Sequence, residues 1–277
     1  MDSPSIHGCK NKQIFMLNEL EHFPNHPLKT STSSLGALTR FALRFALGVL
    51  AVRLRNDCYM TLKQPIKSPF SNCGKRLFAW MMATCSTAYE EAVAERKQAL
   101  FSNLHGNVLE IGPGSGPNLS YYPHDIHWIG IEPNPFMHPY LQKEAERLGL
   151  SIDLRTGTAE RLEAEDNSID TIVSTLVLCS VPDLPRTLQE ILRVLKPGGR
   201  FLFLEHVAAP QGTWLRKIQS GIRPIWQVIG DGCHPDRETG SALETAGFET
   251  VDYQQFRAPV PVVSPQIVGI ATKKAAS

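Results

Sequence analysis

The sequence lacks the features that mark disulfide-stabilised and metal-binding proteins. Its six cysteines form no CxxC pair, whereas disulfide scaffolds are short and dense in cysteine. We therefore expect reduced thiols in a reducing, cytoplasmic compartment. HExxH and zinc-ligand spacings are also missing, and the adjacent Cys233 and His234 are too close together to chelate one metal. The sequence thus predicts no metal site.

An excess of charge of either sign is missing as well. The 28 basic and 27 acidic residues leave a net charge of +1, so the chain has no global field to attract nucleic acid. Residues 1–59 hold seven of the basic and four of the acidic side chains, and residues 60–277 therefore carry −2. We expect no nucleic-acid partner, and the absence of a basic patch favours a small-molecule substrate.

Long apolar runs are absent from the one stretch that could contact a membrane, residues 35–55. Its longest uncharged run has eight residues, whereas a membrane span needs ~20. Arg40, Arg44 and Arg55 fall on one face of a helix drawn at ~100° per residue. This pattern fits an interfacial amphipathic helix that contacts a membrane peripherally, an organelle-targeting helix, or a poorly ordered leader.

The domain organisation follows from this change of pattern along the chain. We expect residues 1–69 to form a leader, partly disordered, with the amphipathic helix at 35–55. Met60 is followed by a polar segment, so natural translation could also begin there. Residues 70–277 are predicted to form one folded domain.

Short apolar runs alternate with helical patterns after residue 83, where a helix is predicted over 83–104. Strand–helix alternation with nearly continuous apolar strands predicts an α/β fold, a doubly wound and mostly parallel sheet covered on both faces. The last two runs, near 249–256 and 264–272, are close enough to form an antiparallel C-terminal pair. The other five runs are Val108–Ile111, Trp128–Ile131, Ile152–Leu154, Thr171–Leu178 and Phe201–Leu204.

A glycine-rich turn follows the first of these strands. Gly112, Gly114 and Gly116 stand in a GxGxG spacing, and glycines allow positive φ and let a ligand lie against bare backbone. Glu132 ends the next strand, 20 residues after Gly112. An acidic side chain at that place can bind both hydroxyls of a ribose. The loop, the acid and the strand–helix alternation together predict a nucleotide site.

The spacing argues against dinucleotides and nucleoside triphosphates. The dinucleotide fingerprint needs a glycine or alanine where this chain has Pro117 or Leu119, depending on the frame. A Walker loop fails because no GK[ST] follows. Glu110, just before the loop, favours a cofactor that carries a cationic amine and no pyrophosphate.

At these residues the chain resembles the class I S-adenosylmethionine-dependent methyltransferases, over about residues 105–272. Three further segments carry the resemblance: Gly157–Glu160, Asp170–Thr175 and Arg193–Arg200. It implies a Rossmann-like fold with seven strands, a methyltransferase domain over 70–277, and S-adenosylmethionine as the cofactor. The cofactor-binding residues that it implies are Glu110, Gly112, Gly114, Gly116, Glu132, Pro133, Ala159, Glu160 and Thr175.

A narrower likeness concerns Thr175–Val181, Glu205–Val207 and Ile229–Cys233, which resemble the methyltransferase-like thiol S-methyltransferases. This likeness implies a thiol acceptor. The animal members are membrane-associated through an N-terminal hydrophobic anchor, whereas the leader of this chain is interrupted by arginines. The chain is less closely similar to the C-methyltransferases of quinone synthesis, so C- or O-methylation of a lipophilic quinone or phenol stays open. From another class, a non-catalytic nucleotide-binding partner subunit is the alternative.

Two residues are candidates for the proton transfer that a thiol acceptor needs. His206 follows a buried strand at the carboxyl edge of the sheet, where ligands collect, and its ordinary pKa suits proton transfer. A histidine that caps the strand is the alternative. Asp231, between two glycines, could reach a substrate from a loop or could merely form a turn.

Overall fold

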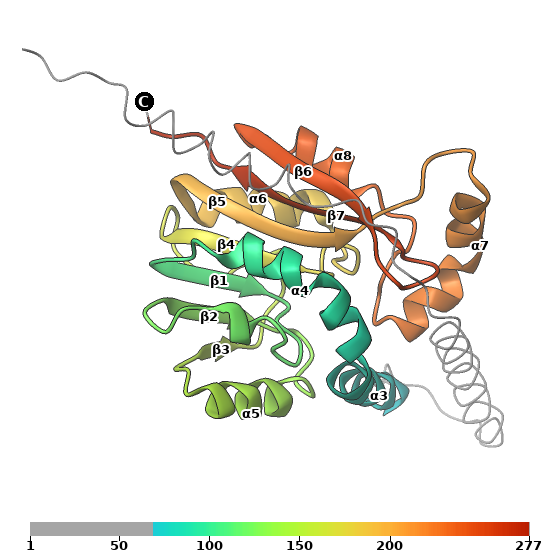
Figure 1. Ribbon diagram of the computed structural model, residues 1–277, viewed down its shortest axis with the longest axis horizontal. Helices are drawn as coiled ribbons and strands as arrows, with labels where there is room; N and C mark the ends of the chain where they lie inside the picture. The colour runs from blue at the N-terminus through green and yellow to red at the C-terminus, as the bar shows by residue number, and fades with distance from the viewer. Residues whose placement is uncertain (1–68, 277) are drawn as a thin grey trace, which may run out of the picture. The chain divides into compact units, whose positions relative to one another are not determined.

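A computed structural model of the protein describes residues 69–276 (Figure 1). The leader predicted over 1–69, including the amphipathic helix at 35–55, lies outside the described residues apart from its last position. Among the helices of the described part, none is long and apolar enough to cross a membrane.

One seven-stranded sheet forms the centre of the domain. Strands β1 to β5 are parallel, and β7 pairs antiparallel with both β5 and β6, so that the strand order is β3-β2-β1-β4-β5-β7-β6. The predicted mostly parallel sheet with an antiparallel C-terminal pair is confirmed. The strands are β1 (Asn107–Ile111), β2 (His127–Ile131), β3 (Asp153–Arg155), β4 (Ile169–Thr175), β5 (Leu195–His206), β6 (Thr250–Arg257) and β7 (Pro265–Thr272).

The helices confirm the predicted alternation except at its start. The single helix expected over 83–104 is wrong, because α3 ends at Cys85 and α4 begins at Thr87. The carbonyl of Ser86 accepts the N–H groups of both Tyr89 and Glu90, so a new helix starts there without a glycine or proline to mark the break. The helices are α3 (Pro69–Cys85), α4 (Thr87–Phe101), α5 (His138–Leu148), α6 (Leu184–Val194), α7 (Trp214–Ile229) and α8 (Thr239–Thr245).

Both faces of the sheet are buried, and β5 shows how. Successive side chains of a strand point to opposite faces. Phe201 and Phe203 therefore join the apolar cluster under α6 and α8, while Leu202 and Leu204 join the cluster under α4 and α5. In Figure 1, α4 crosses in front of the sheet and α6 lies behind it. The domain is thus doubly wound, as the continuous apolar strands predict.

The strand order determines where a ligand can bind. From β1 the chain proceeds to β2 and β3 on one side, and then returns to place β4 and β5 on the other side. A crevice forms at such a switch point, outside the carboxyl ends of the strands. The segments that follow β1, β2, β4 and β5 all meet at this edge.

Candidate functional site

A cavity of about 330 Å³ lies at the carboxyl ends of β1, β2 and β4, within the ~300–1,000 Å³ usual for small-molecule sites. Helix α3 contributes Lys75, Phe78 and Met82 to one side, and the loops after the strands contribute most of the rest. Eight of the nine residues predicted to bind the cofactor line this cavity: Glu110, Gly112, Gly114, Glu132, Pro133, Ala159, Glu160 and Thr175.

The glycines of the loop have different functions although all three have positive φ, at 59°, 58° and 88°. A Cβ on Gly112 would come within 2.7 Å of the Val177 side chain. The loop therefore lies too close to the segment after β4 for any side chain at this position. A Cβ on Gly114 would meet no atom within 4 Å, and this backbone faces the cavity.

Gly116 lies against α5 and outside the cavity lining. A Cβ there would lie 2.8 Å from the side chain of Leu141 in α5. The glycine allows α5 to pack under the loop. Its contact with the cofactor stays a prediction.

Glu132 lines the cavity and is 5% exposed. Its two carboxylate oxygens accept the backbone N–H of Gly114 at 2.9 Å and that of Asn134 at 2.7 Å. Burial raises the pKa of this carboxyl, and the two N–H groups oppose that shift because they favour the ionised form. An ionised carboxylate can accept about four hydrogen bonds, so the oxygens keep capacity for ligand hydroxyls.

Glu110 borders the cavity, but its carboxylate is occupied by donors from the protein. Asn118 donates at 2.7 Å, Tyr122 at 2.9 Å and Trp128 at 3.1 Å. Burial raises the pKa of this carboxyl, and the three hydrogen bonds lower it. Asn118 also donates to Thr175 Oγ1 at 3.0 Å. Glu110 therefore links β1 to the glycine loop and β4, and its predicted contact with a cationic amine remains a prediction.

A third buried carboxylate, that of Glu205, supports the wall from behind. It accepts hydrogen bonds from Ser174 Oγ at 2.6 Å and from the backbone N–H groups of Val177 and Leu178. Burial raises its pKa as well. Between these partners Leu176 lines the cavity with a φ of 58°, a left-handed conformation that costs about 1–3 kcal/mol outside glycine. Glu205 thus holds a strained loop in place.

Another part of the cavity wall comes from the segment after β3. Ala159 and Glu160, which are predicted to bind the cofactor, line the cavity there. The Glu160 carboxylate accepts the backbone N–H of Asp183 at 3.3 Å, and its carbonyl accepts from Arg186. This segment is therefore tied to the start of α6.

The two candidates for proton transfer lie in different surroundings. Asp231 lines the cavity, has a φ of 47°, and its Oδ2 accepts from Asn134 Nδ2 at 3.4 Å. It is both a turn residue and a wall residue. His206 ends β5 at the carboxyl edge, as predicted, but its ring is 3% exposed and is not among the residues that line the cavity.

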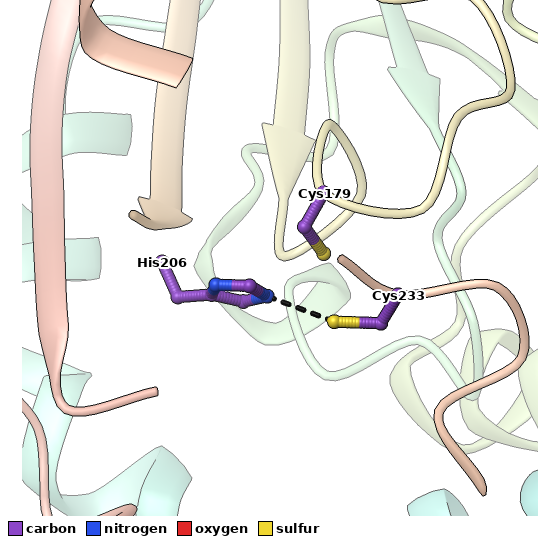
Figure 2. Close-up of side chains that lie close together, drawn as sticks. All are labelled: Cys179, His206 and Cys233. Atoms are coloured by element: carbon purple, nitrogen blue, oxygen red, sulfur yellow. Dashed lines mark hydrogen bonds between the residues drawn. The ribbon is translucent and has the colours of Figure 1, made fainter. Parts of the chain in front are cut away.

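His206 instead faces two cysteines (Figure 2). Its Nε2 lies 3.0 Å from Cys233 Sγ, and its Nδ1 is buried without a hydrogen-bond partner among the described residues. The sulfurs of Cys179 and Cys233 and a ring nitrogen of His206 all lie within 4.8 Å of one another. Both cysteines are free and buried. Spacing in the sequence does not show this cluster, because the fold gathers donors that are far apart in the sequence.

Comparisons with known proteins agree with this geometry. A family described as "Methyltransferase domain" matches residues 109–203. The human thiol S-methyltransferase TMT1A is 38% identical over 212 residues, which cover 72% of this chain and 87% of that protein. Human TMT1B is 37% identical over 215 residues, with the same coverage. The crystal structure of a SAM-dependent methyltransferase from Aquifex aeolicus matches 71% of this chain and 97% of that chain, with a TM-score of 0.50 and 16% identity. That likeness supports the fold alone.

Replacing Glu132 should weaken the binding of S-adenosylmethionine. We expect Glu132→Ala to lose one or two charge-assisted hydrogen bonds, each contributing about 1.5–3 kcal/mol, and Glu132→Gln to lose less because one acceptor remains. Glu146→Ala, an exposed acid on α5, is the control. Calorimetric titration of the three folded variants measures the effect, and unchanged affinity in Glu132→Ala would contradict the assignment.

The pH dependence of binding gives the same prediction a second readout. The Glu132 carboxyl accepts hydrogen bonds from hydroxyl groups best when it is ionised, and burial raises its pKa above the ordinary 4.5. Affinity should therefore fall on acidification through that raised pKa. In Glu132→Gln this component of the pH dependence should be missing.

Proposed function

Since the chain belongs to the S-adenosylmethionine-dependent methyltransferases, in the family that includes the human thiol S-methyltransferases, we propose that its acceptor is a small-molecule thiol. The observation that carries this proposal is the 38% identity to TMT1A over 72% of the chain. An enzyme of this class transfers the methyl group of S-adenosylmethionine to its acceptor.

The residues of the cavity fit the cofactor. Gly114 presents bare backbone where a side chain would occupy the cavity, and Glu132 has carboxylate capacity for ribose hydroxyls. We propose that Pro133, Ala159 and Glu160 line the part of the cavity that holds the adenosine. Thr175 and the Gly112 backbone then line the part that holds the methionine. When bound, S-adenosylmethionine supplies a methyl group that its positively charged sulfur makes electrophilic.

The rest of the lining supports an acceptor with an apolar part. Phe78 and Met82 from α3 and Val181 and Pro182 from the loop after β4 line the cavity together with Asp231. Lys75 and Glu90 also line the cavity, so this lining suits a thiol that has an apolar part and a polar end. We infer that this side of the cavity holds the acceptor.

Methyl transfer from a sulfonium is an in-line displacement, and the protein contributes mainly orientation. In intramolecular reactions, correct orientation of the reacting groups lowers the activation barrier by roughly 7–11 kcal/mol. Glu110, Glu132 and Glu205 fix the loops around the cavity. Loops fixed in this way can orient the donor and the acceptor.

The acceptor must also lose a proton, because a thiol with a pKa near ~8.5 is only a few per cent ionised at neutral pH. Asp231 is the candidate base that lines the cavity. As the carbon–sulfur bond forms, the thiol proton would pass to its carboxylate or to water that it orients. His206, behind the wall, is the alternative.

An acceptor screen tests the function directly. We expect methylated products from lipophilic thiols when the full-length protein is incubated with S-adenosylmethionine and analysed by mass spectrometry. Phenols and quinols are assayed beside the thiols under the same conditions. Methylation of a quinol or phenol in preference to every thiol would contradict the proposal and favour the alternative acceptor class.

The base is tested by comparing two variants with two thiols. We expect Asp231→Asn to lower turnover of a high-pKa alkyl thiol by about 10²–10⁴, as is usual for loss of a general base. The loss should shrink for an acidic aromatic thiol, which is already ionised at the assay pH.

His206→Asn is the matched comparison. If His206 has a structural role, this variant should lower the melting temperature and leave turnover per folded molecule nearly unchanged with both thiols. A larger, thiol-dependent rate loss in His206→Asn than in Asp231→Asn would assign the base to His206 and reject Asp231.

A further inference from the structure

We propose that Cys179, His206 and Cys233 bind one zinc ion, which joins the two loops behind the cavity wall to the end of β5. The three side chains come from separate parts of the fold: the loop after β4, the last residue of β5, and the turn after α7 (Figure 2). None of them lines the cavity. The site is therefore distinct from the one that holds the methyl donor.

The identity of the donors favours a thiophilic cation. Two cysteine sulfurs and one imidazole nitrogen are the ligands that Zn²⁺ prefers, whereas Mg²⁺ and Ca²⁺ require oxygen. Glu205, the nearest carboxylate in the sequence, has both oxygens engaged by Ser174 and the backbone of Val177 and Leu178. Three of the about four acceptor positions of this carboxylate are thus taken by the protein, whereas the two sulfurs and the imidazole nitrogen face one another.

The spacing of the donor atoms is also compatible with zinc. Zn–S bonds of ~2.3 Å and Zn–N bonds of ~2.0–2.1 Å in a tetrahedron put neighbouring ligand atoms about 3.5–3.8 Å apart. Here the three atoms lie within 4.8 Å of one another, and Cys233 Sγ lies 3.0 Å from His206 Nε2. Small rotations of the side chains therefore suffice. Three protein ligands leave the fourth position of the ion for a water molecule.

The backbone around the cluster is held in position by other bonds. The N–H of His234 donates to the carbonyl of Cys179 at 2.9 Å, which joins the two cysteine-bearing segments directly. Arg237 donates to the carbonyls of Leu178 and Val181 at 2.8 and 2.6 Å and so holds the loop that carries Cys179. The ligands are thus largely in place before an ion binds.

An outer hydrogen bond to one of the sulfurs supports the same conclusion. Trp226 Nε1 in α7 donates to Cys233 Sγ at 3.3 Å. Donors of this kind orient a metal ligand and tune its sulfur. His206 Nε2 points toward the sulfurs, and the buried Nδ1 of the same ring has no partner among the described residues, which leaves it for a water molecule, one of the usual partners of the second ring nitrogen of a metal-binding histidine.

The site has a consequence for the cavity because its ligands adjoin wall residues in the sequence. Ser180 follows Cys179, and Asp231 stands two positions before Cys233; both line the cavity. A zinc ion would fix these two parts of the wall relative to each other. This effect rests on the proposed function, whereas zinc binding itself does not.

Metal analysis of the full-length protein tests the proposal. Protein prepared without a histidine tag, in a phosphine reductant, should contain about one zinc per chain after gel filtration. The variants Cys179→Ala and Cys233→Ala should lose the zinc or bind Zn²⁺ more weakly. Loss of an outer hydrogen-bond partner lowers metal affinity by about 10–100-fold, and loss of a ligand should lower it by more than that. Cys73→Ser/Cys85→Ser, which removes two exposed cysteines of α3, should retain the zinc.

Cobalt substitution provides a readout that does not depend on the folding of a variant. Wild-type protein freed of metal and titrated with Co²⁺ should show thiolate-to-metal charge-transfer absorption, which Zn²⁺ should abolish by displacement. Folded wild-type protein with reduced cysteines that shows neither zinc nor this absorption would overturn the proposal. A Cys179–Cys233 disulfide in the isolated protein, or zinc retained by both cysteine variants, would overturn it too. None of these outcomes depends on methyl transfer, so failure of the proposed function leaves the metal test intact.

Discussion

Three buried carboxylates at the carboxyl edge of the sheet hold the loops that form the cavity. Glu110 binds the segment after the glycine loop, Glu132 binds the loop itself through the N–H of Gly114, and Glu205 binds the segment after β4. Burial raises the pKa of all three, and their hydrogen bonds oppose that shift. A buried carboxylate is costly unless it is hydrogen-bonded. Each carboxylate is therefore stabilised by the N–H groups and side chains that donate to it, and the carboxylate in turn fixes the loop that carries those donors.

This mutual requirement explains how strained backbone persists where the chemistry is expected. Leu176, which lines the cavity between the partners of Glu205, has a φ of 58°. Such conformations survive when the surrounding structure determines them strongly. Loops fixed in this way before a ligand arrives lose little freedom on binding, which favours both affinity and orientation of the reacting groups.

The sequence predicts well what depends on local patterns. The runs of apolar residues predict all seven strands, and the glycine loop with Glu132 predicts where the cavity lies, but most of its lining residues, among them those of α3, are not singled out by the sequence. Local patterns do not predict the helix break at Ser86, the contact of Gly116 with Leu141, or the protein donors around Glu110. The cluster of Cys179, His206 and Cys233 is the clearest case, since His206 and Cys233 are 27 residues apart. Their proximity results from the fold, and a short sequence motif therefore does not predict it.

The most direct test is a crystal structure of the full-length protein with S-adenosylhomocysteine, the product of methyl transfer. The ribose hydroxyls should lie within hydrogen-bond distance of the Glu132 carboxylate, and the amino-acid part should lie against the backbone of Gly112 and Gly114. The sulfur should then point toward the part of the cavity that Asp231 lines. A ligand bound elsewhere, or bound here without contact to Glu132, would contradict the assignment of this cavity as the methyl-transfer site.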